Sequence, residues 1–256
     1  MFSISHLNTI RAAEIEVIAA QLQPAGARVL EIGAGTGQQA AALSARGYDM
    51  VAIEMPTSNY AADRVFPIVD FDGSHIPFPD HSFDIVFSSN VLEHVPNLVQ
   101  MHSEIRRVLK PGGYALHVLP THSWRFWTTL SAFPAGLQYA WTLEEQLFPR
   151  RPISLDDLKR AVVAWYNAGK HVLAPFKQTR HGERGNIFSE TWLFRPGWWR
   201  KNFRDNRFDI VDEAPIGLFY TGNMVFNEKW SIERRRRVSH VLGSACHMFK
   251  LKPRVS

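Results

Sequence analysis

The sequence has little cysteine and no long apolar run. Cys246 is the only cysteine among 256 residues. An internal disulfide and a cysteine zinc cluster are therefore excluded, and cysteine usage does not favour secretion. No apolar run approaches the roughly 18 residues that a membrane-spanning helix needs. Residues 1–22 lack the basic start and long apolar core of a signal peptide. These absences predict a cytoplasmic protein.

The composition is that of a globular protein with a basic excess. Hydrophobic residues make up 45% and charged residues 21% of the chain, and the net charge is +5. A sizeable core is therefore available, and the length fits one α/β domain with or without a cap. The basic excess gathers at residues 234–237 and 250–254. Such a run is either a solvated helix face or a contact for phospholipid or nucleic acid.

Short apolar strands alternate with helices in the first half of the chain. We expect strands at 28–32, 50–54, 66–71, 83–88 and 114–119, and helices at 10–23, 38–45 and 99–109. This alternation predicts βαβ units and a doubly wound, mostly parallel sheet. The carboxyl ends of its strands share one edge, where open α/β sheets bind ligands.

The pattern changes after Pro120. Residues 121–190 are rich in Trp, Phe, Pro and His, and we expect an inserted helical cap there, mostly helical at 155–173. A helix at 198–206, a sixth strand at 208–213 and a seventh at 216–225 complete a seven-stranded sheet. A basic helix at 231–249 resembles an interfacial helix, although its apolar face could equally pack on the protein itself. We divide the chain into a cofactor-binding half (1–120), the inserted cap or substrate region (121–190), and the end of the sheet with the basic C-terminal helix (191–256).

A glycine-rich turn follows the first strand, with Glu31, Gly33, Gly35 and Gly37 at alternate positions. Glycine lets the backbone turn sharply and approach a ligand closely. A dinucleotide fingerprint would place its third glycine at position 38, which is Gln38 here. The spacing therefore favours a ligand other than NAD and leaves an NAD-linked oxidoreductase as the weaker alternative.

Two further strands end in acidic residues. Glu54 closes the second strand, where a carboxylate can accept two hydrogen bonds from ribose hydroxyls. A strand-end acid that faces solvent is the alternative. Asp72 could accept from an adenine amino group while the N–H of Gly73 or a neighbour serves a ring nitrogen. The alternative for this pair is an ordinary Asp-Gly turn.

Several motifs in order resemble the class I S-adenosylmethionine-dependent methyltransferases, close to the type 11 group. They are VLEIGAGTG (29–37), Glu54, DGSHIPFPDHSFDIV (72–86), NVLEHV (90–95) and LKPGG (109–113). The resemblance implies a Rossmann-like methyltransferase fold with S-adenosyl-L-methionine as cofactor. It places Glu31, Gly33, Gly35 and Gly37 at the methionine part, Glu54 at the ribose, Met55 on the adenine, Asp72 and Gly73 at the adenine edge, and Ser89 near the sulfonium. It does not reach residues 121–190, where such families place substrate specificity.

Methyl transfer to oxygen also needs a base, and three histidines are candidates. His122 follows the fifth strand at the expected binding edge. His94 sits just after the fourth strand, where a structural role is the alternative, and His181 could be an ordinary loop histidine. Paired aspartates at metal spacing are lacking, so we predict no metal ligands and disfavour a magnesium-dependent catechol-type reaction.

Aromatic density in the inserted segment is typical of an apolar lid or substrate wall, although these side chains could simply pack the cap. Arg125, Arg150 and Arg151 in the same segment could hold an anionic group such as phosphate. The resemblance suggests a bulky small-molecule, glycan or lipid-linked acceptor, methylated on oxygen or carbon. We do not expect nucleic acid as a partner, and the basic C-terminal helix suggests peripheral membrane contact. The alternatives are an RNA or protein methyltransferase that uses the basic tail, and a nucleotide-binding module without catalysis.

Overall fold

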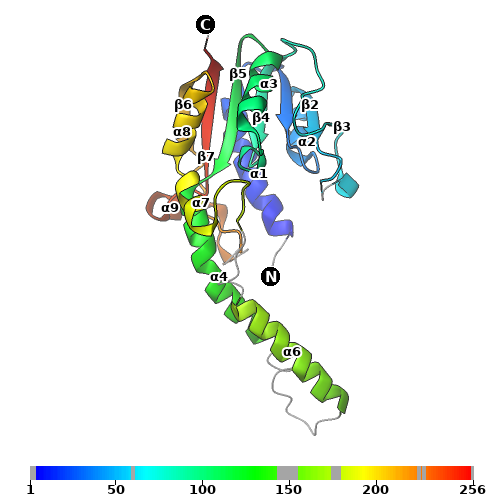
Figure 1. The fold of residues 1–256 in the computed structure, drawn as a ribbon, viewed down its shortest axis with the longest axis vertical. Coiled ribbons are helices and arrows are strands. Elements are labelled where there is room, and N and C mark those ends of the chain that lie inside the picture. Colours follow the sequence, from blue (N-terminus) through cyan, green and yellow to red (C-terminus); the bar gives the residue numbers. More distant parts are fainter. Residues whose placement is uncertain are drawn as a thin grey trace.

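The computed structural model describes residues 4–58, 61–142, 155–173, 180–223, 226 and 229–254. Its centre is a seven-stranded sheet in the order β3-β2-β1-β4-β5-β7-β6 (Figure 1). The strands are β1 Arg28–Ile32, β2 Asp49–Glu54, β3 Ile68–Asp70, β4 Phe83–Ser89, β5 Leu109–Pro120, β6 Phe208–Pro215 and β7 Cys246–Pro253.

The first five strands run parallel to their neighbours, and only β7 reverses the direction. β1 pairs in parallel with β2 and β4, and these in turn pair in parallel with β3 and β5. β7 pairs antiparallel with both β5 and β6. The predicted doubly wound, mostly parallel seven-stranded sheet is confirmed, and the carboxyl ends of five strands meet at one edge.

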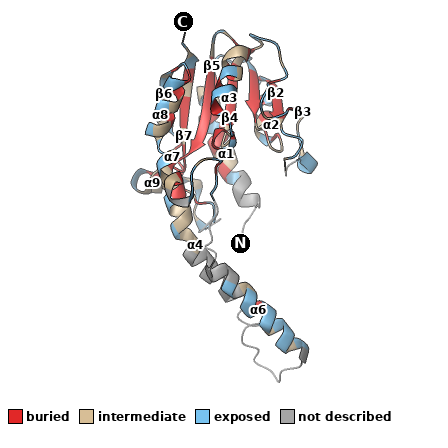
Figure 2. Ribbon diagram, in the orientation of Figure 1, coloured by how far each residue is buried: buried red, intermediate tan, exposed pale blue. Residues whose placement is uncertain are grey.

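Helices cover both faces of the sheet. They are α1 Ile4–Gln21, α2 Gln38–Ser44, α3 Leu98–Val108, α4 His122–Thr142, α6 Leu155–Leu173, α7 Ile187–Leu193, α8 Pro196–Asp205 and α9 Ile232–Leu242, with short 3-10 turns η1 Ala61–Asp63 and η2 Leu92–His94. α3 and α8 share one apolar core with the sheet, and α1 and α2 share a second. The central strands β1, β4, β5 and β7 are largely buried, whereas the edge strands β3 and β6 are mostly exposed or half-buried (Figure 2).

The predicted strands and helices of the first half agree with the structure to within a few residues, with one informative difference. β5 begins at Leu109 and runs through the predicted turn at KPGG. Its register against β4 shifts between Phe83 and Ile85, and Gly112 has φ 82°. The glycines therefore form a bulge inside a longer strand rather than a separate turn.

The inserted segment is helical, as predicted. α4 and α6 contact each other, and α6 extends away from the sheet as an arm (Figure 1). Several large apolar side chains of α6 are exposed, among them Val162, Trp165 and Tyr166. No helix within the described residues has the length and apolar character needed to span a membrane.

Two predictions for the last quarter are wrong. Residues 216–223 form no strand, and residues 224 and 225 lie outside the described residues. The seventh strand is β7. The expected helix at 231–249 ends at Leu242, so the basic helix is α9 and is not C-terminal. Gly243 has φ 88° and breaks the helix. The residues that follow form β7, whose side chains alternate between the two cores: Cys246 and Met248 pack in one, and Phe249 and Leu251 in the other.

The basic run is only partly a solvated face. Arg235 is buried and its Nη1 donates to the carbonyl of Phe219 at 3.1 Å. Its neighbours Arg234, Arg236 and Arg237 are exposed. Membrane contact through α9 stays a prediction.

The corrected end of the chain can be tested by two alanine substitutions. Phe249 is fully buried, whereas Val241 is 85% exposed. We expect Phe249→Ala to lower the free energy of unfolding by about 3–5 kcal/mol. Val241→Ala should change it by less than about 0.5 kcal/mol. Urea unfolding measures both. Similar effects would instead support the helix at 231–249, which places both side chains on one face.

Candidate active site

A cavity of about 1440 Å³ lies at the carboxyl edge of the parallel strands. One end is formed by the glycine turn after β1 and the end of β2. The other end contains side chains from η2, the start of α4, the loop before α7 and the start of β7. The residues at this second end include His94, Trp124, His181, Tyr220 and Cys246. The predicted ligand edge therefore carries a real cavity that reaches from the first strand to the last.

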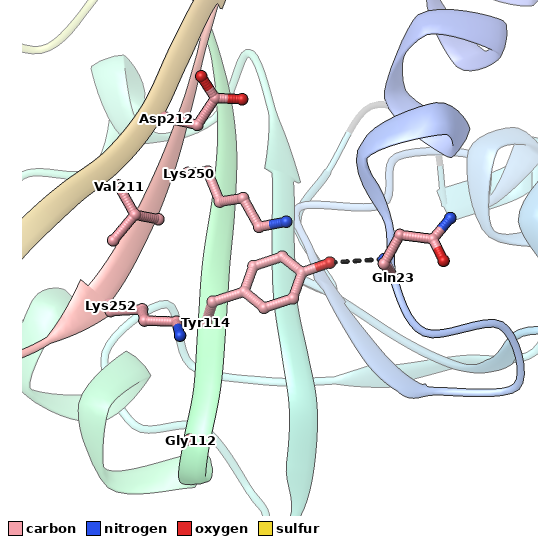
Figure 3. A pocket seen from close by; sticks show the side chains of 7 residues that line it. All are labelled: Gln23, Gly112, Tyr114, Val211, Asp212, Lys250 and Lys252. Carbon is pink, nitrogen blue, oxygen red and sulfur yellow. Dashed lines mark hydrogen bonds between the residues drawn. The ribbon is translucent and has the colours of Figure 1, made fainter.

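A second hollow of about 450 Å³ lies at the other end of β5 and β7. Figure 3 shows its lining, in which the Tyr114 hydroxyl accepts a hydrogen bond from the backbone N–H of Gln23 at 2.8 Å. The Lys250 ammonium lies 4.2 Å from the centroid of the Tyr114 ring. None of the site residues predicted from the sequence lines this hollow.

Backbone contacts fix the glycine turn against β2. The N–H groups of Gly33 and Ala34 both donate to the carbonyl of Ile53, at 2.9 and 3.1 Å. Gly33 has φ 70°, and a Cβ at this position would lie 2.5 Å from a methyl group of Val91. Gly33 and Gly35 line the cavity. A side chain at position 33 would thus collide with its neighbour in addition to straining the backbone.

Glu54 joins the turn to the end of β2. One carboxylate oxygen accepts from the N–H of Gly35 at 2.8 Å, and the other accepts from the N–H of Met55 at 2.8 Å. Glu54 and Met55 both line the cavity. Each carboxylate oxygen can accept a further hydrogen bond, so the group can support the turn and still receive ligand hydroxyls.

Glu31 is a buried carboxylate just before the turn. Its side chain is 1% exposed, and its Oε2 has no hydrogen-bond partner within the described part of the chain. Burial, with a smaller contribution from the Glu54 charge, raises the pKa of Glu31 to about 8, although a hydrogen bond from the Ala40 N–H acts in the opposite direction. Glu31 does not line the cavity. A cationic group bound at the turn would stabilise its ionised form.

Gly73 and Ser89 line the cavity, but Asp72 and Gly37 do not. One oxygen of the exposed Asp72 carboxylate accepts from the N–H groups of Ser74 and His75, both at 2.7 Å. These two bonds lower the pKa of Asp72. Asp72 therefore lies in a turn that its own side chain stabilises, which is the alternative that the sequence left open for this residue. Gly37 instead begins α2, with φ 81°.

The structure brings two of the three candidate histidines together. His94 and His181 line the cavity, with ring centroids 4.8 Å apart, and the Trp124 ring lies 4.7 Å from that of His181. Burial lowers the pKa of His181 to about 4 and also lowers that of His94, so both are neutral near pH 7. His122 begins α4 and does not line the cavity.

Glu93 lies beside this pair and was not singled out from the sequence. It is 1% exposed, and its Oε1 lies 3.8 Å from His94 Nε2 and 4.0 Å from His181 Nε2. Burial raises the pKa of Glu93 to about 8, and Arg11 and Arg184 act in the opposite direction. Glu93 belongs to the NVLEHV motif, but the motif gave it no role because its partner His181 is far away in sequence.

A buried polar network closes the same end of the cavity. Glu14 pairs with Arg11 at 2.6 Å and accepts from the Tyr220 hydroxyl at 2.7 Å. That hydroxyl lies 3.0 Å from Cys246 Sγ, which donates to Asn90 Oδ1 at 3.3 Å. Cys246 lies far from the fourth strand in sequence, yet β7 brings its thiol to Asn90, the residue that follows β4. Burial holds the pKa of this thiol well above its usual value, so it is a poor nucleophile.

Arg125, which could have held an anionic substrate group, is instead used inside the protein. Its Nε lies 3.1 Å from Glu190 Oε2, and both side chains are buried. The other oxygen of Glu190 accepts from the N–H groups of His181 and Gly182, at 2.5 and 2.6 Å. This ion pair therefore anchors the loop that carries His181. Arg150 and Arg151 lie outside the described residues.

Comparison with known proteins connects this geometry to one family. Residues 30–117 match the family model described as a methyltransferase domain. An uncharacterized methyltransferase of Mycobacterium sp. (strain KMS) is 36% identical over 108 residues, which cover 41% of this chain and 43% of the relative. Another, from Mycobacterium tuberculosis (strain ATCC 25618 / H37Rv), is 41% identical over 96 residues, covering 35% of this chain and 38% of that protein. The matches thus span less than half the length of these curated relatives.

Solved structures resemble nearly the whole chain. A S-adenosylmethionine-dependent methyltransferase from Mesorhizobium loti has a TM-score of 0.54 at 14% identity, covering 93% of this chain and 97% of that one. One from Aquifex aeolicus has a TM-score of 0.51 at 12% identity, covering 98% of both chains. At such low identity, these likenesses show the fold alone.

The seven-stranded sheet and its flanking helices have the fold of the S-adenosylmethionine-dependent methyltransferases. Residues 30–117 belong to the methyltransferase-domain family. The resemblance carried by the glycine turn, the strand-end acids and the NVLEHV and LKPGG motifs is confirmed for this segment, and S-adenosyl-L-methionine is the cofactor of this class.

Removal of the Glu54 carboxylate should weaken cofactor binding. Glu54→Ala deletes a charged hydrogen-bond acceptor, a loss of about 1.5–3 kcal/mol. We therefore expect about 10–100-fold weaker binding of S-adenosylhomocysteine by isothermal titration calorimetry. Asp49→Asn, at the opposite end of β2, is the control and should bind normally. Unchanged affinity in a folded Glu54→Ala protein would contradict the assignment.

Proposed function

We propose that the chain transfers the methyl group of S-adenosyl-L-methionine to an oxygen or a carbon of a bulky small-molecule, glycan or lipid-linked acceptor. The observation that carries this proposal is the continuity of the cavity from the glycine turn to His181. Its volume of about 1440 Å³ exceeds the roughly 300–1,000 Å³ of an ordinary ligand pocket. A cofactor at the glycine turn would therefore leave room for a second molecule.

The residues at the first end of the cavity fit the cofactor. The glycine turn allows the backbone to approach a ligand, Glu54 offers acceptors to ribose hydroxyls, and the unpartnered Oε2 of Glu31 suits a nearby ammonium group. Met55 and Gly73 would lie against the adenine, with Ser89 toward the sulfonium. Asp72 and Gly37 do not line the cavity, so we propose that they act by shaping the backbone next to it. Asp72 holds the turn that contains Gly73, and Gly37 begins α2.

The second end of the cavity suits an acceptor with a large apolar part. Val95, Pro96, Met101 and Trp124 supply apolar surface to this wall. The polar groups among them are His94, His181, the Tyr220 hydroxyl and Arg11, whose guanidinium pairs with Glu14. This combination of apolar walls and few polar groups is typical of small-molecule sites, and it favours a bulky small acceptor over a nucleic acid strand.

The bound cofactor supplies a methyl group activated by its sulfonium, so the protein mainly has to hold the acceptor in line with that methyl. An acceptor hydroxyl must also lose its proton as the new bond forms. His94 and His181 are neutral and can accept a hydrogen bond from that hydroxyl. We leave His122 out of this role, because it does not line the cavity.

Labelled methyl transfer tests the proposal. The chain is incubated with methyl-labelled cofactor and separate lipid, glycan, small-metabolite, RNA and protein fractions of a cell extract. We expect label in a lipid, glycan or small-metabolite fraction, and mass spectrometry then identifies the product. His181→Ala should lower turnover by about 100-fold or more while S-adenosylhomocysteine still binds.

Two outcomes of this experiment would contradict the proposal. Label confined to RNA or protein would favour a macromolecular acceptor, for which binding should fall steeply with salt. Binding of the cofactor without transfer to any fraction would favour a nucleotide-binding module. Binding of NADH in place of the adenosyl cofactor would overturn the cofactor assignment itself.

A further inference from the structure

Three side chains converge at the acceptor end of the cavity without being bonded to one another. One ligand atom from each of Glu93, His94 and His181 lies within 4.8 Å of the other two. Glu93 Oε1 is 3.8 Å from His94 Nε2 and 4.0 Å from His181 Nε2. These separations are too long for direct hydrogen bonds, so the three groups face a common gap.

The Glu93 carboxylate lacks the partners that a buried carboxylate normally has. Neither of its oxygens has a hydrogen-bond partner within the described residues. The neighbouring Arg184 donates to the backbone carbonyls of Val95, Leu92 and Glu93, at 2.6, 2.8 and 3.2 Å, rather than to this carboxylate. A buried carboxylate without hydrogen bonds is costly, and a cation in the gap would remove that cost.

The gap has nearly the size that a metal ion requires. Zinc lies about 2.0–2.2 Å from imidazole nitrogen and carboxylate oxygen, which places its ligand atoms roughly 3–3.5 Å apart. The two distances from Glu93 Oε1 are 3.8 and 4.0 Å, and the ligand atoms of the two histidines lie at most 4.8 Å apart, so metal binding requires the side chains to close by roughly 0.5–1.5 Å. Two imidazoles and one carboxylate also form a ligand set that suits zinc or a similar transition metal.

The ligands are held in place by the protein. Glu190 binds the backbone N–H groups of His181 and Gly182, and the N–H of Glu183 donates to the carbonyl of Glu93 at 2.9 Å. A Cβ on Gly182 would lie 2.8 Å from that same carbonyl oxygen, so glycine permits the close approach. The loop with His181 is thus fastened to the turn with Glu93 and His94, which pre-organises the three groups.

We propose that Glu93, His94 and His181 bind one divalent transition-metal ion at the acceptor end of the cavity. His94 and His181 line the cavity, so three protein ligands leave a coordination position open toward it, as in catalytic metal sites. The sequence predicted no metal ligands, because it lacks paired aspartates at metal spacing. Two of the ligands are adjacent in sequence, and the fold supplies the third.

The role of this ion rests on the proposed function, although its binding does not. An acceptor hydroxyl bound at the open position would release its proton to water, because a metal lowers the pKa of a bound oxygen. The alkoxide oxygen then forms a bond to the methyl carbon. The carbon–sulfur bond breaks, and its electron pair returns to sulfur. His94 and His181 would then act as metal ligands instead of as proton acceptors.

Metal titration of the full chain tests the site. Protein treated with a chelator and then dialysed is titrated with Zn²⁺ by calorimetry and with Co²⁺ by visible absorption. We expect one ion per chain and a Co²⁺ spectrum of a nitrogen- and oxygen-bound ion. Glu93→Gln and His181→Ala should each weaken binding by more than about tenfold, since loss of even an outer-shell partner costs 10–100-fold. His240→Ala, which removes an exposed histidine of α9, should leave binding unchanged.

Separate measurements distinguish this inference from the proposed function. S-adenosylhomocysteine should bind Glu93→Gln as it binds the parent chain, which shows that the variant is folded. Failure of the parent chain to bind an ion stoichiometrically, or equal losses in His240→Ala, would overturn the site even if methyl transfer is found. Full turnover of the metal-free protein would overturn the role given to the ion. Cofactor binding without any transfer, together with stoichiometric metal, would instead reject the proposed function and keep the site.

Discussion

The attachment of the glycine turn to the end of β2 is the constraint on which the active site depends. Ile53 receives the N–H groups of Gly33 and Ala34, and Glu54 receives that of Gly35. β1 and β2 pair in parallel up to Ile32 and Ile53. The glycine turn therefore begins directly beside the end of β2. These three hydrogen bonds hold the backbone of the turn in one conformation. The cavity beside the turn therefore has a defined shape.

The reversal of β7 determines what else reaches that pocket. Because β7 runs antiparallel to β5, its first residue, Cys246, pairs with Pro120 at the carboxyl edge. Tyr220 and Glu14 then join Cys246 in one buried network. The start, the middle and the end of the chain thus meet at the acceptor end. An acceptor bound there would contact segments that the methyltransferase-domain match at residues 30–117 does not include.

Local signals explain which parts of this arrangement could be predicted from the sequence. β1, β2 and β4 are short apolar runs, and their alternation with helices predicts the parallel sheet. Glu54, Gly33 and Gly35 follow from where these runs end. β7 was missed because Val238, Val241 and Leu242 have helical spacing, which the prediction extended past Gly243 into a segment with the period of a strand. The pairing of Glu93 with His181 could not be predicted, because it depends on how the loop before α7 folds back onto η2.

Two buried carboxylates show how the two ends of the cavity differ. Glu31 lies by the glycine turn and Glu93 lies beside His94 and His181, and burial raises the pKa of each to about 8. One oxygen of Glu31 and both oxygens of Glu93 lack a hydrogen-bond partner within the described residues, which is unfavourable for a buried acid. Each would become favourable when a cation arrives, and the cations differ in kind. An ammonium group suits a lone carboxylate such as Glu31, whereas a carboxylate beside two imidazole nitrogens, as at Glu93, suits a metal ion. Neither acid lines the cavity itself, but each is adjacent in sequence to residues that do, Ile32 and His94, so a buried acid lies next to the lining at each end.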